Sequence, residues 1–387
     1  MVAQLSAASP GELLALIRGE GGLTRAQLLG RTGMARSTLY GRLDQLQNAG
    51  LIHEAHRRST TVGRPAAVLT FDARGRVVVT IDIGHHRATV SLRDLEGHAL
   101  DEFVHRRADA ESLPELVARL CAVGQRQLRS ADGVRLMGVG IALPVPVDTH
   151  TGVRQASIGL PDARYPITER VSELFGVRVS VENDARALTM GAATEVPPMD
   201  EDAVLLGIKF STGLGLGLLT GGRVLRGSTG EAGDVGHLQI TPGVGAVCTC
   251  GRRGCLAAEV SGRAVVRDLS RSGVRDVGGL VALYDAGDAE VVERVQSAAR
   301  TLGTHLAGFV QATNPRYVAF GGFLGGRASV AGQVISSIRE RVSARISEVV
   351  EYRVVGSDRV TAAGLVALVV DDVLAPSVVD DCLSGAQ

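Results

Sequence analysis

The sequence of 387 residues lacks tryptophan, has only 3% aromatic residues, and uses lysine once, at Lys209, among 41 basic residues. We attribute the preference for arginine to codon composition. No stretch reaches the roughly 20 uninterrupted apolar residues of a membrane span. The first residues, MVAQLSAASP, lack the basic head and apolar run of a signal peptide. We therefore expect a cytoplasmic protein without a membrane partner.

Cysteine is also scarce, and its five copies are an odd number, which argues against a disulfide framework. Three of the five are clustered at Cys248, Cys250 and Cys255, and His237 precedes them by a short loop. Three thiolates and an imidazole form a closed tetrahedral set for Zn²⁺, which is typical of structural zinc. The pattern therefore predicts one structural zinc ion per chain, and three buried or redox-active thiols are the alternative.

The formal net charge is zero, but the charge is distributed unevenly along the chain. Residues 1–80 contain ten arginines and five acidic residues, so the remainder carries the opposite surplus. A basic segment on an acidic body indicates an anionic partner for that segment alone. A solvated basic face would give the same count.

The N-terminal segment has the pattern of a helix-turn-helix. Leucines at helical spacing in GELLALIRGE predict a first helix, and Thr24 is suited to begin a second. After the turn TGM, a third helix follows in ARSTLYGRLDQLQNAG, with Gly50 as its stop. Two short helices joined by a tight turn with glycine are typical of this motif.

The third predicted helix buries a leucine stripe, which leaves Arg36, Ser37 and Tyr40 on its other faces. Arg36 and Ser37 lie at the N-terminal end, the part that enters the major groove in such motifs. Arginine can donate in pairs to guanine or bind phosphate. We therefore expect these three residues to contact DNA.

Two short strands, at 51–53 and 67–71, flank the polar basic segment HRRSTTVGRP. This hairpin resembles the wing of a winged helix, and Arg57, Arg58 and Arg64 could contact phosphates or the minor groove. We expect a winged helix-turn-helix DNA-binding domain over residues 1–75. A helical protein-interaction module is the alternative.

From residue 76 onward, strand-like and helix-like stretches alternate, and several strands end in glycine-rich turns. Examples are IDIGHH, KFSTGLGLG and FGGFLGG. Each loop alone is weak evidence, because tight turns use glycine for backbone reasons. Together they predict an α/β body over residues 76–387 with a cleft between two lobes.

At residues 232–255, AGDVGHLQITPGVGAVCTCGRRGC, the chain resembles the ROK family of repressors, open reading frames and sugar kinases. The family pattern is Ala-Gly-Glu-x-Gly-His followed by Cys-x-Cys-Gly-x-x-Gly-Cys. The resemblance implies the actin-like, ribonuclease H-like fold of two-lobed sugar kinases. It also implies that the histidine on zinc contacts the sugar.

The same resemblance suggests the ligand-binding residues. Asn183 and Asp184 match the family's Asn-Asp pair, in which the aspartate is the general base of the kinases. Asp234 and His237 fall on the sugar-contacting positions. Capping of the helix that follows is the alternative role for the Asn-Asp pair.

Several positions depart from the family's sugar-binding pattern. Asp234 replaces a glutamate, Ala257 replaces a carboxylate that holds sugar hydroxyls, and Val145 replaces the glycine of a Pro-Gly-Pro turn. The segment Ala156-Ser157-Ile158 stands where the family has Ala-Pro-Asn. A buried hydroxyl without its partner costs about 1–3 kcal/mol, so ordinary hexose binding is in question.

The two loops that bind phosphate in the family's kinases also depart from the family pattern. The kinase loop Asp-x-Gly-Gly-Thr has His85 and His86 at its last two positions, and the second loop has Ser211 and Leu216 where glycine is favoured. Because phosphoryl transfer depends on positioning and charge stabilisation, we expect no kinase activity and treat Asp184 as a vestigial base. Alternatively, partly charged imidazoles of these histidines bind an anion.

We therefore expect a DNA-binding transcriptional regulator, with repression as the commoner mode of the family. It would act as a homodimer or homotetramer on a palindromic double-stranded operator and sense a sugar or related molecule. One alternative is an ATP-dependent sugar kinase with an accessory DNA-binding head. Another is a regulator whose pocket binds no ligand.

Overall fold

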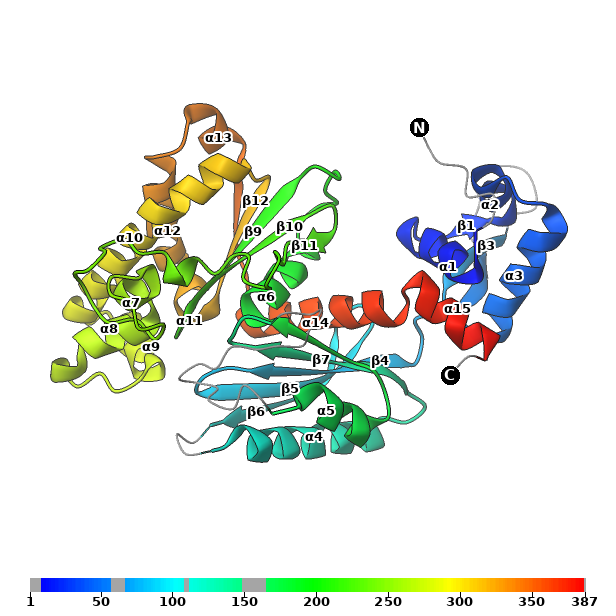
Figure 1. The fold of residues 1–387 in the computed structure, drawn as a ribbon, viewed down its shortest axis with the longest axis horizontal. Coiled ribbons are helices and arrows are strands. Elements are labelled where there is room, and N and C mark those ends of the chain that lie inside the picture. Colours follow the sequence, from blue (N-terminus) through cyan, green and yellow to red (C-terminus); the bar gives the residue numbers. More distant parts are fainter. Residues whose placement is uncertain (1–7, 57–66, 108–110, 148–164, 386–387) are drawn as a thin grey trace.

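The computed structural model describes residues 8–56, 67–107, 111–147 and 165–385. Its elements form an N-terminal head, residues 10–71, and a body of two lobes (Figure 1). The predicted wing residues Arg57, Arg58 and Arg64, and the segment 156–158, lie outside the described residues. The C-terminal helix lies beside the head, so both ends of the described chain meet there.

The head consists of three helices and a three-stranded antiparallel sheet in the order β1-β3-β2. Its elements are α1 (Pro10–Gly19), β1 (Leu23–Thr24), α2 (Arg25–Thr32), α3 (Arg36–Asn48), β2 (Ile52–His56) and β3 (Ala67–Phe71). Thr24 caps α2 in a reciprocal arrangement with Gln27, and Gly33 ends α2 at a φ of 64°. Because that left-handed conformation favours glycine, the turn forms where the sequence predicts it.

The first lobe is built on a five-stranded sheet in the order β6-β5-β4-β7-β8. Strands β4, β7 and β8 are parallel, and β5 and β6 continue the sheet antiparallel. Its elements are β4 (Arg76–Ile83), β5 (Arg87–Asp94), β6 (Ala99–Arg106), α4 (Leu113–Ser130), β7 (Arg135–Leu143), α5 (Ile167–Phe175) and β8 (Val179–Asn183). Helices α4 and α5 cover one face of this sheet.

The second lobe repeats this topology in the order β11-β10-β9-β12-β13. Strands β9, β12 and β13 pair in parallel, and β10 and β11 continue the sheet through antiparallel pairs. Its strands are β9 (Val204–Phe210), β10 (Leu214–Thr220), β11 (Arg223–Val224), β12 (Tyr317–Gly321) and β13 (Glu351–Val354). Its helices are η1 (Val235–His237), α7 (Leu256–Val260), α8 (Gly262–Asp268), η2 (Ser270–Ser272), α9 (Val277–Asp285), α10 (Ala289–Thr313), α11 (Gly322–Gly325), α12 (Ala328–Arg339) and α13 (Ala344–Val349). The repeat confirms the predicted two-lobed α/β fold.

Two helices, α6 (Asp184–Ala193) and α14 (Ser357–Val373), pack against each other between the two sheets. Their backbones approach closely at two glycines. A Cβ atom on Gly191 would lie 1.7 Å from the carbonyl oxygen of Val360, and one on Gly364 would lie 1.9 Å from that of Ala187. Larger side chains would force the helices, and with them the lobes, apart.

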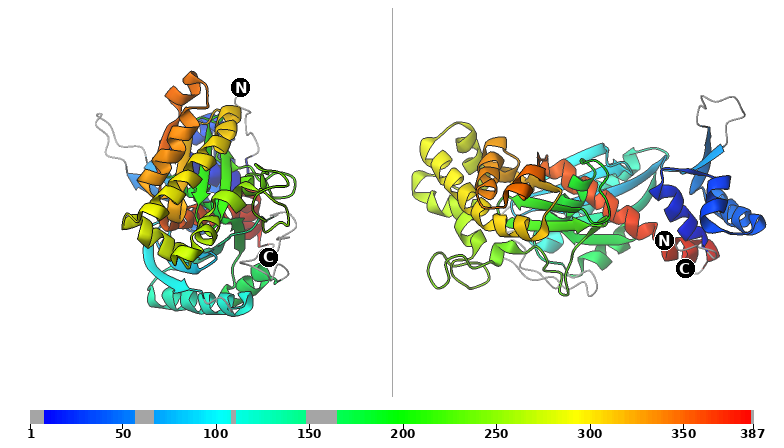
Figure 2. Two further views of the ribbon diagram at one scale, coloured as in Figure 1. Left: turned by 90° about the vertical axis from the view of Figure 1, so that its left-hand side faces the viewer. Right: turned by 90° about the horizontal axis from the view of Figure 1, so that it is seen from above.

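The C-terminal helix α15 (Pro376–Ser384) leaves the body and packs on α1 of the head. Asp380 Oδ1 accepts a hydrogen bond of 2.8 Å from the Gly11 amide. One buried cluster includes Leu13 and Leu14 of the head together with Val369 of α14. Figure 2 shows α14 and α15 as a path from the body to the head. The head therefore shares its core with the end of the chain.

Among the described residues, no single helix has the length and hydropathy to cross a membrane. The bent pair Asp358–Val373 and Pro376–Ser384 has them only in combination, across a bend of 52°. Val369 and Val379 of this pair are buried in the cluster shared with the head.

Replacing Gly364 with alanine should lower the free energy of unfolding by about 1–3 kcal/mol, because the methyl group has no space against α6. Urea unfolding of the full chain measures this change. Gly308→Ala in α10 is the matched control, because an added Cβ there meets nothing within 4 Å. It should leave stability unchanged or raise it by about 0.5–1 kcal/mol. A Gly364→Ala protein as stable as the control would contradict this packing.

Candidate functional site

A cavity of about 860 Å³ lies between the two lobes. Its wall is formed by the β4–β5 turn, the β8–α6 junction, the β9–β10 turn, the cysteine loop and helices α7 and α8. Strand ends from both sheets therefore meet in it. The volume lies within the roughly 300–1,000 Å³ of small-molecule sites.

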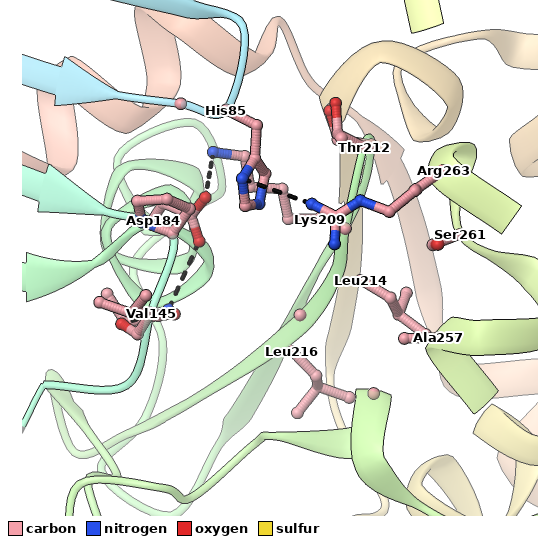
Figure 3. Close-up of a pocket in the computed structure, with 18 of the residues that line it drawn as sticks. His85, Val145, Asp184, Lys209, Thr212, Leu214, Leu216, Ala257, Ser261 and Arg263 are labelled. Atoms are coloured by element: carbon pink, nitrogen blue, oxygen red, sulfur yellow. Dashed lines mark hydrogen bonds and ion pairs between the residues drawn. The ribbon is translucent and has the colours of Figure 1, made fainter. Parts of the chain in front are cut away.

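Asn183 and Asp184 stand at the junction of β8 and α6, where the sequence pattern places the ligand-binding pair. The Asn183 side-chain oxygen accepts hydrogen bonds from the amides of Ala185 and Arg186 and so caps α6. Its side-chain nitrogen donates to the Val145 carbonyl at 3.1 Å. The capping role thus belongs to Asn183, and Asp184 lines the cavity (Figure 3).

Lys209, on β9, donates a hydrogen bond of 2.8 Å from Nζ to Oδ2 of Asp184. Burial acts to lower the pKa of Lys209, but the charges of Asp184 and Asp82 outweigh it and raise the pKa above its usual value. The candidate base therefore stands in an ion pair with an ammonium group. A role for Lys209 in the site does not follow from any sequence motif, and the one available signal is that it is the single lysine of the chain.

Asp82 ends β4 beside this pair. Burial raises its pKa, and the charge of Lys209 acts in the opposite direction. Its Oδ1 atom is buried and has no hydrogen-bond partner within the part of the chain that the structure describes. Asp82 therefore leaves a buried acceptor at the cavity wall.

His85 and His86, in the β4–β5 turn, both line the cavity, as the sequence pattern predicts. Burial, reinforced by the charge of Arg263, lowers the pKa of His85 to about 4. His85 is therefore expected to be neutral at pH 7, which argues against a charged imidazole as the anion-binding group at this position. Its Nδ1 atom lies 3.5 Å from Nη2 of Arg263 on the opposite lobe (Figure 3).

The wall formed by the second lobe is partly apolar. Leu214, Leu216 and Ala257 line it together (Figure 3). Glu259, the nearest carboxylate after Ala257, is turned away and accepts a hydrogen bond of 2.8 Å from the Ala246 amide. At Leu216 and Ala257 the cavity therefore presents hydrocarbon where the family pattern has glycine and a carboxylate.

The cysteine loop brings four potential metal ligands together, and their ligand atoms all lie within 4.8 Å of one another. The set is His237, Cys248, Cys250 and Cys255. Nδ1 of His237 lies 3.3 Å from Sγ of Cys248, and the sulfurs of Cys250 and Cys255 are 3.7 Å apart. Asp234 lies behind the imidazole, with Oδ2 3.8 Å from Nε2.

Local geometry explains how this loop closes. The Cys248 amide donates to the Arg252 carbonyl at 2.7 Å, and the Gly251 amide donates back to Cys248 at 3.0 Å. Gly254 has a φ of 72°, and a Cβ atom there would lie 1.9 Å from the Thr241 carbonyl oxygen. Burial raises the pKa of Cys255 to about 12, so a thiolate at this position needs a compensating cation. The donor set therefore fits a thiophilic metal such as zinc.

In the head, Arg36, Ser37 and Tyr40 are exposed at the start of α3. Tyr40 is 40% exposed, and the Arg25 guanidinium lies 5.7 Å from its ring centroid. Leu39 and Leu43 on the other side of α3 are fully buried. The start of α3 thus presents an exposed face with Arg36, Ser37 and Tyr40, and its contact with DNA remains a prediction.

Comparison with known proteins relates these features to a family. The ROK family profile matches residues 78–371. The xylose repressor of Bacillus subtilis is 26% identical over 337 residues, which span 84% of this chain and 83% of that protein. The glucokinase of Thermotoga maritima is 30% identical over 309 residues, which span 74% of this chain and 94% of that enzyme.

Among solved structures, a ROK family transcriptional regulator homologous to the Escherichia coli MLC protein superposes with a TM-score of 0.75 at 25% identity. The superposition covers 96% of this chain and 98% of the regulator, so it includes the head as well as the body. The chain belongs to the ROK family.

Proposed function

We propose that this protein is a DNA-binding transcriptional regulator that acts as a repressor and senses a sugar or related molecule. In this proposal, residues 1–75 are the winged helix-turn-helix DNA-binding domain, and residues 76–387 are the sensing and dimerisation body. The observation that carries it is the exposed start of α3 on the packed head. The similarity to a regulator over both head and body supports it.

DNA recognition would use the start of α3, with Arg36, Ser37 and Tyr40 in the major groove. Arg57, Arg58 and Arg64 would contact the backbone or minor groove beside it. A homodimer or homotetramer would present two heads to the half-sites of a palindromic operator. An arginine pair to guanine contributes about 1–3 kcal/mol of discrimination.

The cavity supports sensing rather than catalysis. Phosphoryl transfer would require Asp184 to take a proton from a sugar hydroxyl. Its Oδ2 atom instead accepts from Lys209, and its Oδ1 atom accepts from the side-chain nitrogen of Asn183. His85 lies in the turn expected to hold phosphate. The similarity to a glucokinase keeps a sugar kinase with a DNA-binding head as the second candidate.

A route from the cavity to the head supports this role. Gly356 and Asp358, at the start of α14, line the cavity, and Asp358 forms an ion pair with Arg87 of the first lobe. Helix α14 then continues toward α15, which packs on α1. A ligand that shifts α14 would therefore displace the DNA-binding head.

The metal site completes the proposal. His237, Cys248, Cys250 and Cys255 would hold one structural zinc ion, which fixes the loop that forms one wall of the cavity. His237 and Asp234 would then face the ligand together with Asn183 and Asp184. Metal loss should disturb ligand binding as well as folding.

Replacing Arg36 with alanine should raise the dissociation constant for operator DNA by about tenfold to a hundredfold, because a base or phosphate contact is lost. Fluorescence anisotropy at fixed salt measures it on DNA from upstream of the gene. Arg129→Ala removes one exposed charge from the end of α4 in the body and should bind as the wild type does. If Arg36→Ala and Arg129→Ala both bind with the affinity of the wild type, Arg36 at the start of α3 does not contact DNA.

Replacing Cys250 with serine should reduce zinc from about one ion per chain to nearly none and lower the thermal midpoint, because three ligands hold zinc poorly. Metal analysis and calorimetry of the purified chain provide the two values. Cys382→Ser changes an exposed thiol outside the cluster and should preserve both. A metal-free wild type of full stability would refute a structural zinc.

With ATP and a panel of hexoses, the wild type should release no ADP above background, because Lys209 holds the candidate base in an ion pair. A coupled assay for ADP measures this. Clear turnover that Asp184→Asn abolishes would instead establish the kinase as the correct function.

A further inference from the structure

The positively charged side chains around the cavity differ in whether a carboxylate pairs with them. Five of the six lysine and arginine side chains that line it form ion pairs with carboxylates. The pairs are Arg87 with Asp358, Arg186 with Glu182, Lys209 with Asp184, Arg267 with Asp268 and Arg327 with Asp285. Arg263 has no carboxylate partner within the described ranges.

The backbone at Arg263 is held in place by hydrogen bonds to the β9–β10 turn. Its amide donates to the Thr212 carbonyl at 3.1 Å, and the preceding Gly262 amide donates to the Ser211 carbonyl at 2.8 Å. The start of α8 is therefore tied to the β9–β10 turn. In Figure 3 the guanidinium extends from the second lobe toward His85.

The contact with His85 does not neutralise Arg263. The two nitrogens are 3.5 Å apart, at the limit for a hydrogen bond, and the imidazole is neutral at pH 7. Burial lowers the pKa of Arg263. A partly buried guanidinium without a carboxylate partner is unfavourable, so a bound anion would stabilise it.

The opposite side of the cavity has the complementary character. On the first lobe, Asp82 and Asp184 line the cavity wall. Carboxylates of this kind accept hydrogen bonds from hydroxyl groups. The cavity is thus polarised, with acceptors for hydroxyls on one side and Arg263 on the other.

We propose that the sensed ligand is a polyhydroxylated molecule with an anionic group, and that Arg263 and the adjacent Thr212 bind this group. The anion is a phosphate monoester or a carboxylate, since a guanidinium recognises both. The inference rests on the proposed sensing function and specifies its ligand class. Because Arg263 faces His85 across the cleft, the bound anion bridges the two lobes.

The test is calorimetry on the full chain at constant ionic strength, with inorganic phosphate, glucose 6-phosphate, glucuronate and glucose as probes. Inorganic phosphate tests the anion site whatever the sugar, and the two anionic sugars distinguish ester from carboxylate. The variants are Arg263→Met, Arg263→Lys and the control Arg271→Met, which removes an exposed charge of the same lobe.

Arg263→Met should weaken binding of phosphate and of the preferred anionic sugar by about tenfold to a hundredfold, since a charge-assisted pair is lost. Arg263→Lys should fall between, and Arg271→Met should match the wild type. Any affinity for glucose should not change. The thermal midpoint of Arg263→Met should stay level or rise, because a buried unpaired charge is removed.

No phosphate binding at about 10 mM, a concentration that detects even weak sites, would overturn the proposal. Equal affinity of Arg263→Met and wild type for the anions would overturn it too. DNA affinity without ligand separates this inference from the proposed function. If the wild type binds no upstream DNA yet binds anions through Arg263, the regulator assignment fails and the anion site stands.

Discussion

The close packing of α6 against α14 is the constraint on which the rest of the structure depends. Gly191 and Gly364 let the two backbones touch, and this contact joins the two sheets. The same helices carry residues into the cavity at their first turns, Asp184 from α6 and Asp358 from α14. A ligand that moves these residues therefore acts directly on the contact between α6 and α14. Helix α14 extends from that contact toward the head.

The charges in the cavity are the basis for proposing that this kinase-like scaffold acts as a sensor. Lys209 neutralises Asp184, the residue that a kinase would leave free to act as a base. Ala257 and Leu216 make one wall apolar, whereas Arg263 has no carboxylate partner among the residues that the structure describes. Such a site is suited to bind a ligand across the cleft. Binding requires less precise positioning of groups than transfer of a phosphoryl group does.

The sequence predicted features that depend on local chemistry. The start of α2 at Thr24, the turn at Gly33 and the clustering of the cysteines with His237 follow from short-range hydrogen bonds, glycine conformation and residue spacing. The two-lobed body followed from strand ends rich in glycine and from a family pattern. These elements could be recognised because their determinants lie within a few residues of one another.

The features that escaped prediction depend on contacts between distant segments. The packing of α15 on α1 joins residues more than 360 positions apart, as in the Gly11–Asp380 hydrogen bond. The neutrality of His85 comes from burial against Arg263, 178 positions away in the chain. Strand β1 has only two residues and no periodicity to reveal it. Charge pairing and burial are set by the folded cavity, so sequence patterns carried little information about Lys209.

The central claim is that a ligand in the cavity controls DNA binding by the head. The most direct measurement is a fluorescence-anisotropy titration of the protein on upstream DNA, with and without a compound that calorimetry shows to bind. The salt concentration must be fixed, because phosphate contacts make DNA affinity strongly salt-dependent. We predict that the bound compound shifts the DNA dissociation constant. Tight DNA binding that stays the same when the cavity is saturated would contradict the account.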